Sequence, residues 1–289
     1  MIEVLISQVV NGLVLGFLYV LIAIGLTIIF GMLGIINFAH GAFFALGAYF
    51  AIMLSSYIGW AGFIVGPLIV GIIGMLTEVV LIRRLYGKEP LLSLIVTFGA
   101  ALFIEAAIRL VWGAGGQPFS PPSILTGVVE FGPIVTTKYR VAVLVITAVI
   151  LAAFWAFLRF TPYGRILRAG GRDPQMVSLL GINLPLVMTA AFGFGIALAA
   201  AAGALAAPLW SVKPNIAEAA VMPAFVTVTI GGLGSNLGAI VAGLLIGVTT
   251  ALTIQFWPEA SAAAMYILMT IVLLVRPRGL FGEQWERFE

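Results

Sequence analysis

The sequence predicts an all-α integral membrane protein, a polytopic helical bundle with about eight or nine membrane-spanning segments. Of its 289 residues, 62% are hydrophobic and only 9% are charged, whereas a soluble domain has roughly 25% charged residues. The apolar residues occur in runs of about 20, the length that an α-helix needs to cross a bilayer. Glycines interrupt the pattern at two places, which predicts two discontinuous segments. Residues 1–289 are therefore expected to form one transmembrane domain.

Each apolar run is bounded by glycine, proline or charged residues. The first glycine break is expected at 31–37 and the second at 231–235. A polar stretch at 159–185 separates two spans. A longer loop at 113–137 contains prolines, and its centre at 128–136 alternates weakly, as in a small hairpin. The spans and the short segment before the second break are expected at 8–30, 38–57, 61–82, 91–112, 139–158, 186–210, 220–230, 237–256 and 260–275.

The distribution of Lys and Arg predicts which ends of the spans face the cytoplasm. The loops at 83–90 and 159–185 and the tail from residue 276 hold most of the positive charge, and such loops are cytoplasmic by the positive-inside rule. The opposite side keeps Lys138, Arg140 and Lys213, with Arg109 near the membrane edge. About nine crossings would then place the N-terminus outside. The residues assigned to the cytoplasm are Arg83, Arg84, Lys88, Arg159, Arg165, Arg168, Arg172, Arg276, Arg278 and Arg287.

The composition excludes several classes of function. The net charge of +3 comes from small loop clusters, so no basic face is expected to bind nucleic acid. The chain has no cysteine and one histidine, His40, so we expect no metal site. Motifs for nucleotide binding, nucleophilic serine and zinc proteolysis are absent, so we expect no catalytic residues. The first residues lack a basic segment and a cleavage site, so no removable signal peptide is expected.

The two glycine breaks resemble each other and predict a transport path. Residues 27–34 and 227–234 share Thr, Gly, Leu and Gly at the same spacing. Interrupted helices at corresponding positions of two halves are typical of transporters, because their free backbone groups can line a cavity. The alternative is that the glycines only allow close helix packing. The candidate path residues are Thr27, Gly31, Asn37, His40, Thr227, Thr229 and Gly231.

Ionisable residues inside the spans have structural interpretations that we favour. Glu105 and Arg109 lie one helical turn apart, which predicts a neutralising pair. Glu78 precedes Arg83 and Arg84 and is expected to form a local ion pair. His40 is either a proton relay or, by preference, a hydrogen-bonding anchor for the broken segment. Because no run of Asp, Glu and His follows the spans, a carrier driven by protons or sodium is poorly supported.

The polar stretch at 159–185 predicts two short helices beneath the bundle. One is expected at about 163–169, and the other begins with Asp173 as the N-cap and Pro174 at the first helical position. It should end before Gly181. A pair of soluble helices held against a membrane bundle indicates a docking surface, whereas arginines that only set topology would contact lipid head groups.

Three stretches carry a resemblance to a known family. They are residues 25–41 around the first break, residues 164–169 with Asp173 and 180–183, and the tail Arg276-Pro-Arg-Gly-Leu-Phe-Gly282. In these motifs the chain resembles LivH-type permeases, the membrane subunits of branched-chain amino acid ABC importers, and the similarity extends over essentially the whole chain. The resemblance implies an ABC importer permease fold in the bacterial inner membrane.

The resemblance also implies partners and coupling residues. Such permeases pair with a second, related permease, bind two cytoplasmic ATPase subunits, and receive substrate from a periplasmic binding protein, which the loop at 113–137 would face. ATP and Mg²⁺ would be bound by the ATPases, so this chain needs no cofactor of its own. Rigid-body movement of the two short helices would switch the bundle between outward- and inward-facing states. The implied coupling residues are Gly164, Arg165, Arg168, Arg172, Asp173 and Gly181.

Substrate identity stays open at this point. An apolar path with small polar gaps at Thr27, Asn37, Thr227 and Thr229 suits leucine, isoleucine or valine. It would also pass the amides or urea that related importers carry. Two other classes are a stand-alone secondary carrier and a membrane scaffold without transport activity. The carrier would show coupling charges, and the scaffold would need neither the paired breaks nor the polar helix pair.

Overall fold

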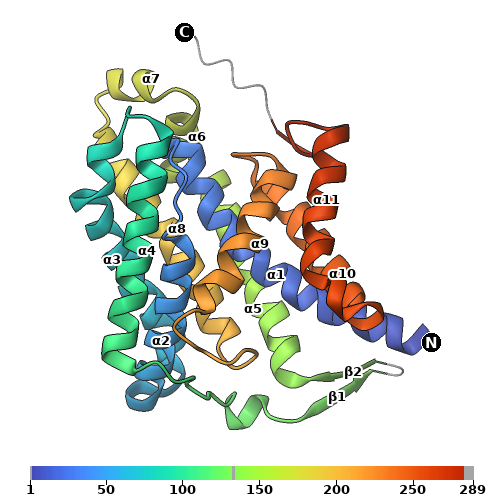
Figure 1. The fold of residues 1–289 in the computed structure, drawn as a ribbon. Helices are drawn as coiled ribbons and strands as arrows, with labels where there is room; N and C mark the ends of the chain where they lie inside the picture. The colour runs from blue at the N-terminus through green and yellow to red at the C-terminus, as the bar shows by residue number, and fades with distance from the viewer. Residues whose placement is uncertain (1, 132–133, 283–289) are drawn as a thin grey trace.

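The structure, a computed structural model, describes residues 2–131 and 134–282 and is almost entirely helical (Figure 1). This confirms the predicted all-α class. The elements are α1 (Ile2–Leu33), α2 (His40–Ile58), η1 (Gly59–Ala61), α3 (Gly62–Val80), η2 (Ile82–Leu85), α4 (Pro90–Trp112), η3 (Ser123–Leu125), β1 (Val128–Phe131), β2 (Ile134–Thr137), α5 (Lys138–Phe160), α6 (Pro162–Arg172), α7 (Pro174–Leu179), α8 (Leu184–Ala206), α9 (Ile216–Gly231), α10 (Asn236–Phe256), η4 (Pro258–Ala260) and α11 (Ser261–Val275).

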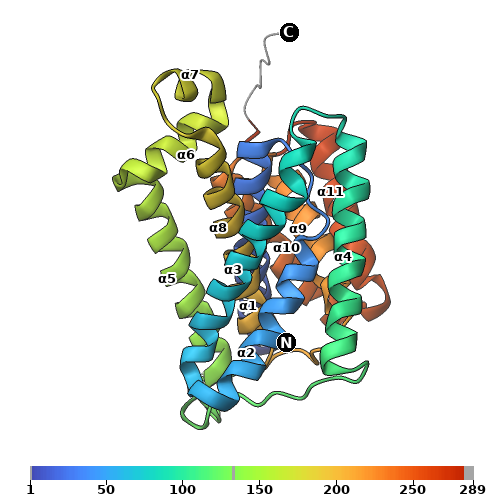
Figure 2. The same cartoon turned by 90° about the vertical axis from the view of Figure 1, so that its left-hand side faces the viewer.

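The helices form a multi-pass membrane bundle. Within the described residues, seven helical stretches are long and apolar enough to cross a bilayer. The longest, His40–Val80, contains both α2 and α3, which the turn at η1 separates and which lie side by side (Figure 2). Counting these two helices separately gives eight, and the shorter apolar helix α9 gives a ninth. The prediction of about eight or nine spanning segments is confirmed.

Helix α8 packs against three other helices through glycines. A Cβ atom at Gly195 would lie 2.6 Å from the carbonyl oxygen of Gly25 in α1. One at Gly203 would overlap the carbonyl oxygen of Phe44 in α2, and one at Gly193 would lie 3.0 Å from the Gly71 carbonyl oxygen in α3. Small residues let membrane helices approach backbone to backbone, which gives dispersion contacts that lipid cannot match. The core of the bundle therefore surrounds α8.

The most extensive contact between two helices of the described chain joins α1 to α10. Gly12 and Gly16 of α1 face Gly243 and Gly247 of α10, so each helix presents two glycines four residues apart. A Cβ atom at Gly247 would lie 2.3 Å from the backbone nitrogen of Gly16. The spacing is the small-xxx-small pattern of membrane helix interfaces. In contrast, α11 contributes no buried residue and lies at the periphery.

Both predicted breaks occur, and one is shifted. Helix α1 continues to Leu33, and the chain leaves it at Gly34, whose φ is 67°. The first break thus begins three residues after Gly31, because Gly31 keeps helical geometry and Gly34 is the residue that takes the left-handed conformation. The second break follows α9 at Gly232, whose φ is 99°, and α10 begins at Asn236, as predicted.

The two ends of the bundle differ in structure. At one end β1 and β2 pair as an antiparallel hairpin with Val128 opposite Thr137, which confirms the weak hairpin signal; its centre at 132–133 lies outside the described residues. At the other end α6 and α7 cover part of the bundle (Figure 1). Helix α1 starts at Ile2 rather than at residue 8, since no helix-breaking residue precedes its apolar part.

Candidate functional site

Helix α6 begins with a sharp reversal from α5. The hydroxyl of Thr161 caps α6 by accepting a hydrogen bond of 3.0 Å from the Gly164 amide, and Pro162 occupies the first turn. A Cβ atom at Gly164 would lie 2.3 Å from the Phe157 carbonyl oxygen in α5. Gly164 therefore lies inside α6, within the helix predicted at about 163–169. Its lack of a side chain allows α6 to lie directly against the end of α5.

Helix α7 has the predicted boundaries. The Asp173 carboxylate accepts a hydrogen bond of 2.8 Å from the Met176 amide, and Pro174 stands at the first helical position. The chain leaves α7 through Gly181, whose φ is 76°, a conformation that favours glycine. The predicted N-cap and the predicted glycine turn are both confirmed. The helix stands off the end of the bundle (Figure 2).

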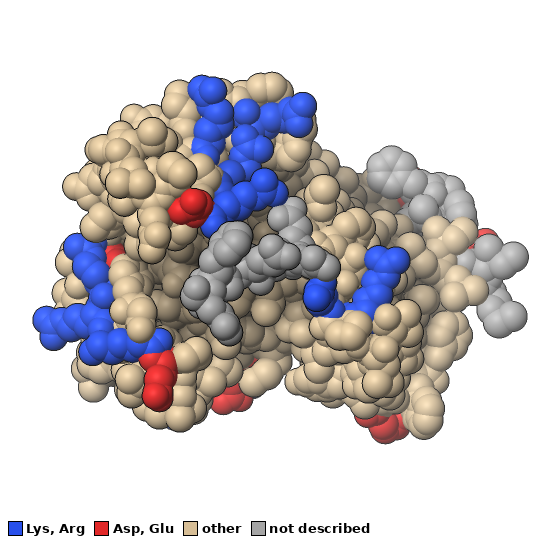
Figure 3. Space-filling model, turned by 90° about the horizontal axis from the view of Figure 1, so that it is seen from above, with Lys and Arg blue, Asp and Glu red and all other residues tan. Residues whose placement is uncertain are grey.

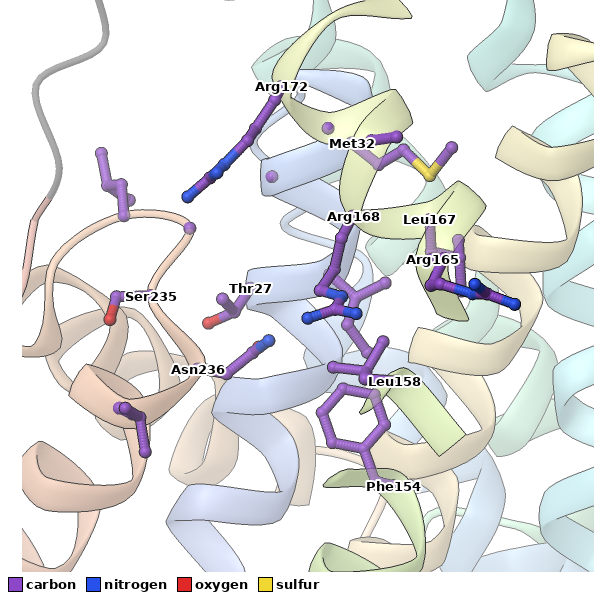
Figure 4. Close-up of a pocket in the computed structure, with 17 residues that line it drawn as sticks. Thr27, Met32, Phe154, Leu158, Arg165, Leu167, Arg168, Arg172, Ser235 and Asn236 are labelled. Carbon is purple, nitrogen blue, oxygen red and sulfur yellow. The ribbon is translucent and has the colours of Figure 1, made fainter. Parts of the chain in front are cut away.

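A cavity of about 770 Å³ lies beneath α6 (Figure 4). Its walls come from α1, the end of α5, α6, and the second break with the start of α10. It brings three of the predicted coupling residues together with two of the predicted path residues, Thr27 and Gly31. The lining residues are Thr27, Ile28, Gly31, Met32, Phe154, Leu158, Arg165, Leu167, Arg168, Ala169, Gly171, Arg172, Leu233, Gly234, Ser235, Asn236 and Leu237.

The two glycine-broken segments meet at this cavity. A Cβ atom at Gly31 would lie 3.7 Å from the Cα of Gly234, in the second break. One at Gly171 of α6 would lie 3.1 Å from the carbonyl oxygen of Gly31. The last turn of α1, which precedes the first break, therefore lies close to both the second break and α6 around one space.

Asn37 and His40 do not line this cavity. Asn37 is fully buried, and its carboxamide oxygen accepts a hydrogen bond of 3.1 Å from the Ala39 amide at the start of α2. The Nε2 atom of His40, also fully buried, lies 3.0 Å from the Ile22 carbonyl oxygen in α1. This geometry ties the start of α2 to α1. It supports the anchoring interpretation of His40 over the proton relay.

Thr227, Thr229 and Gly231 also lie away from the cavity. The Thr227 hydroxyl donates to the Pro223 carbonyl at 2.7 Å, and the Thr229 hydroxyl donates to the Phe225 carbonyl at 2.8 Å. Each hydroxyl thus bonds to the preceding turn of α9. Gly231 packs against the first turn of α10. Of the seven candidate path residues, only Thr27 and Gly31 line this cavity.

Two polar residues of the cavity were missed by the sequence reasoning. Ser235 caps α10 by accepting a hydrogen bond of 3.1 Å from the Gly238 amide. Asn236 follows it, and its carboxamide oxygen is buried without a hydrogen-bond partner among the described residues. A serine directly before an apolar run is a helix start signal, so Ser235 could have been found. The exposure of Asn236 to the cavity depends on the fold.

A smaller cavity of about 190 Å³ adjoins the first between α1, α5 and α10. Five residues line both cavities, among them Arg168 and Asn236. Most of its wall is apolar. The lining residues are Ile24, Leu151, Phe154, Trp155, Leu158, Arg159, Arg168, Asn236, Leu237 and Ile240.

The end of the bundle that carries α6 is strongly basic. Figure 3 shows this face with several separate groups of Lys and Arg and few acidic side chains. Three arginines and no carboxylate line the larger cavity. The guanidinium of Arg159 stacks over Trp155, 5.6 Å from the ring centroid. An anionic ligand entering from this end would therefore meet a favourable potential.

Two ion pairs within the described chain agree with the sequence predictions. Glu105 pairs with Arg109 along α4. Glu78 pairs with Arg83 at 3.1 Å, and its carboxylate also accepts hydrogen bonds from Tyr86 and from Thr189 of α8. Burial and the bond to Glu78 raise the pKa of Tyr86, so its phenol stays protonated and donates at neutral pH. The carboxylates of Glu78 and Glu105 are therefore both neutralised by arginines, and these two residues do not form a proton or sodium pathway.

The family model for the branched-chain amino acid transport system permease component matches residues 8–275. The chain belongs to this family. The permease is 34% identical to the high-affinity branched-chain amino acid transport system permease protein LivH of Escherichia coli strain K12, covering 96% of this chain and 95% of that one. It is 32% identical to BraD of Pseudomonas aeruginosa, which has the same description, with the same coverage.

Two further similarities extend the comparison. The permease is 28% identical to LivM of Escherichia coli strain K12, a permease protein of the same kind of system, over 92% of this chain and 68% of LivM. The solved structure of PsaBC from Streptococcus pneumoniae in complex with Fab has a TM-score of 0.51 at 14% identity, covering 92% of this chain and 89% of that chain. That likeness supports the fold alone.

The permease also carries an exposed apolar surface on α7 and on Leu180, the residue that follows it. Leu179 is 80% exposed and Leu180 is 72% exposed, and Met176 beside them is also exposed. Val177 is buried and holds the helix to the bundle. Large apolar side chains gathered on a protruding polar element indicate a surface for another protein. The sequence reasoning selected the arginines of α6 and missed this surface, because exposure of α7 depends on how the fold presents it.

Proposed function

We propose that this chain is the membrane-spanning permease subunit of an ATP-binding-cassette importer that carries leucine, isoleucine and valine across the bacterial inner membrane. The observation that carries the proposal is the meeting of both broken helices and α6 around one cavity, in a chain similar to LivH over nearly its whole length. In many transporters, discontinuous helices surround the substrate site and supply its polar groups.

The end that carries α6 and α7 faces the cytoplasm in this proposal. Most of the described Lys and Arg residues flank the helices at that end, in agreement with the positive-inside rule. Two cytoplasmic ATPase subunits bind and hydrolyse ATP with Mg²⁺, one of them in contact with α7. The similarity to LivM supports a second permease as the partner in the membrane. A periplasmic binding protein delivers substrate at the end that carries the β-hairpin.

Coupling follows from the contacts of α6. The apolar surface of Met176, Leu179 and Leu180 binds a groove on the ATPase. Movement of the ATPase then displaces α7 and α6 as a rigid pair. Because Gly171 of α6 packs against Gly31, the displacement reaches the last turn of α1, directly before the first break, without an intervening side chain. The cavity opens or closes as the two breaks shift against each other.

Changing Leu179 to Glu is expected to uncouple the permease from its ATPases. A charge at the centre of an apolar docking surface costs at least about 1.4 kcal/mol, so roughly tenfold or more of the ATPase binding should be lost. The measurement is the ATPase activity of the co-purified complex in liposomes, with a leucine-loaded binding protein present.

The matched control is Leu179→Met, which keeps an apolar side chain of similar size and should retain stimulated hydrolysis. Size-exclusion chromatography of the Leu179→Glu permease checks that the fold is intact, as expected for so exposed a position. Full binding and stimulation of the ATPases by the Leu179→Glu protein would move the docking site away from α7.

A further inference from the structure

We propose that the smaller cavity binds the side chain of a branched aliphatic amino acid during translocation, with Arg168 holding the carboxylate and Asn236 and Thr27 receiving the ammonium group. The inference rests on the proposed function and assigns substrate contacts within it. It makes Arg168 a substrate-binding residue of the path in place of a coupling residue.

The apolar wall of the smaller cavity fits a branched hydrocarbon. Ile24, Leu151 and Phe154 are buried behind it. Its volume of about 190 Å³ equals roughly six water molecules in the liquid. Water in a small apolar cavity finds few hydrogen-bond partners, so holding water there is unfavourable. Transfer of an aliphatic side chain from water into such a cavity is favourable. The space therefore suits a side chain of a few carbon atoms and is too small for a large solute.

Arg168 stands where the two cavities join. It lines both, and no carboxylate of the described residues lies within ion-pair distance of it. In Figure 4, Arg168 extends from α6 toward Asn236 at the start of α10, whereas Arg165 points away. The neighbouring Arg159 is already engaged by the Trp155 ring. A guanidinium directed into a cavity and lacking an internal anion is suited to a carboxylate ligand.

Two oxygen atoms near Arg168 complete the set. Thr27 is only 2% exposed and lines the larger cavity, yet its hydroxyl oxygen has no hydrogen-bond partner among the described residues. The carboxamide oxygen of Asn236 is buried and also without a partner there. Buried polar atoms are normally satisfied, so unsatisfied ones at a cavity indicate a missing ligand group. An ammonium group, which has three donors, would satisfy both oxygens.

The three features together describe a zwitterion with an aliphatic side chain. One cation, two free acceptors and an adjoining apolar space match the carboxylate, the ammonium and the hydrocarbon of leucine, isoleucine or valine. An uncharged amide or urea would use neither the guanidinium charge nor the apolar space fully.

Filling the smaller cavity tests the inference. In the complete complex with both permeases, the ATPases and the binding protein, Ile240→Trp places a large ring in the space. We expect leucine uptake to fall at least tenfold while ATP hydrolysis stimulated by the loaded binding protein is retained. The control Val241→Trp adds the same ring at the next position of α10, which is 43% exposed and lines neither cavity. It should transport like the unchanged protein.

A second pair of variants guards against misfolding and tests the charge. Leu237 lines both cavities and is exposed, so Leu237→Trp should assemble even where Ile240→Trp does not. Arg168→Gln should raise the leucine KM at least tenfold with hydrolysis still stimulated. Loss of stimulation together with uptake in Arg168→Gln would assign Arg168 to coupling instead and overturn its substrate role.

The outcomes separate this inference from the proposed function. If the unchanged complex takes up no leucine, the proposed function is wrong. If the unchanged complex transports leucine and both filling variants transport it equally well, the subsite is wrong and the importer assignment stands.

Discussion

Replacing Gly247 with leucine is expected to prevent the permease from folding. The Cβ atom would lie 2.3 Å from the Gly16 backbone nitrogen and 2.4 Å from the Gly12 carbonyl oxygen. Backbone atoms of a packed helix cannot rotate away, so α1 and α10 would have to separate along their longest contact. Overpacking alone costs about 1–3 kcal/mol, and separation also removes the dispersion contacts of the whole interface. The measurement is the yield of monodisperse protein and its thermal unfolding.

The control is Gly99→Leu in α4. Gly99 is also inside a helix, but a Cβ atom there meets no atom within 4 Å. Helix propensity favours leucine over glycine by nearly 1 kcal/mol. Gly99→Leu should therefore unfold at or slightly above the temperature of the unchanged protein. Equal behaviour of the two leucine variants would contradict the packing described between α1 and α10.

Changing Glu78 to Ala is expected to produce the second large loss of stability. Glu78 is fully buried and bonds to three side chains, Arg83, Tyr86 and Thr189, which connect α3 with the start of α8. Leaving a buried donor without its acceptor costs about 1–3 kcal/mol, and here the Tyr86 hydroxyl loses its bond to Glu78. Part of Arg83 remains exposed, so the lower end of that range is expected. Thermal unfolding of the purified permease measures the loss.

A conservative variant separates hydrogen bonding from charge at this site. Glu78→Gln keeps one oxygen as an acceptor for Tyr86 or Arg83, so its loss should be smaller than that of Glu78→Ala. Since α8 follows directly after α7, a loosened Glu78 site should also weaken the mechanical connection between α7 and the bundle. An unfolding temperature of Glu78→Ala equal to that of the unchanged protein would refute the role of this network.

The sequence predicted the elements of this fold better than their mutual arrangement. Runs of apolar residues locate the spans because the bilayer thickness sets their length. Local signals also succeeded: Asp173 caps α7, and Glu78 pairs with Arg83. These features depend on residues close in the chain. The break at 31–37 was misplaced by three residues, since either Gly31 or Gly34 could have taken the left-handed conformation.

The candidate site was harder to predict because its residues come from distant segments. Thr27, Arg168 and Asn236 share a cavity only because α1, α6 and α10 meet at one end of the bundle. Polarity alone made Thr227 as good a candidate as Thr27, but the Thr227 hydroxyl donates a hydrogen bond to the preceding turn of α9. The glycine pairs of α1 and α10 can be recognised in the sequence from their spacing. The sequence does not show which two helices they bring together, because that depends on the whole fold.

The most direct measurement is leucine accumulation in liposomes containing this permease, its partner permease and the two ATPases, with a binding protein outside and ATP on the side of α6 and α7. The expected result is accumulation above the external leucine concentration that requires both ATP and this chain. Accumulation that persists without the ATPases would indicate a stand-alone carrier. Accumulation that persists when this chain is omitted would show that the chain is not the path for leucine.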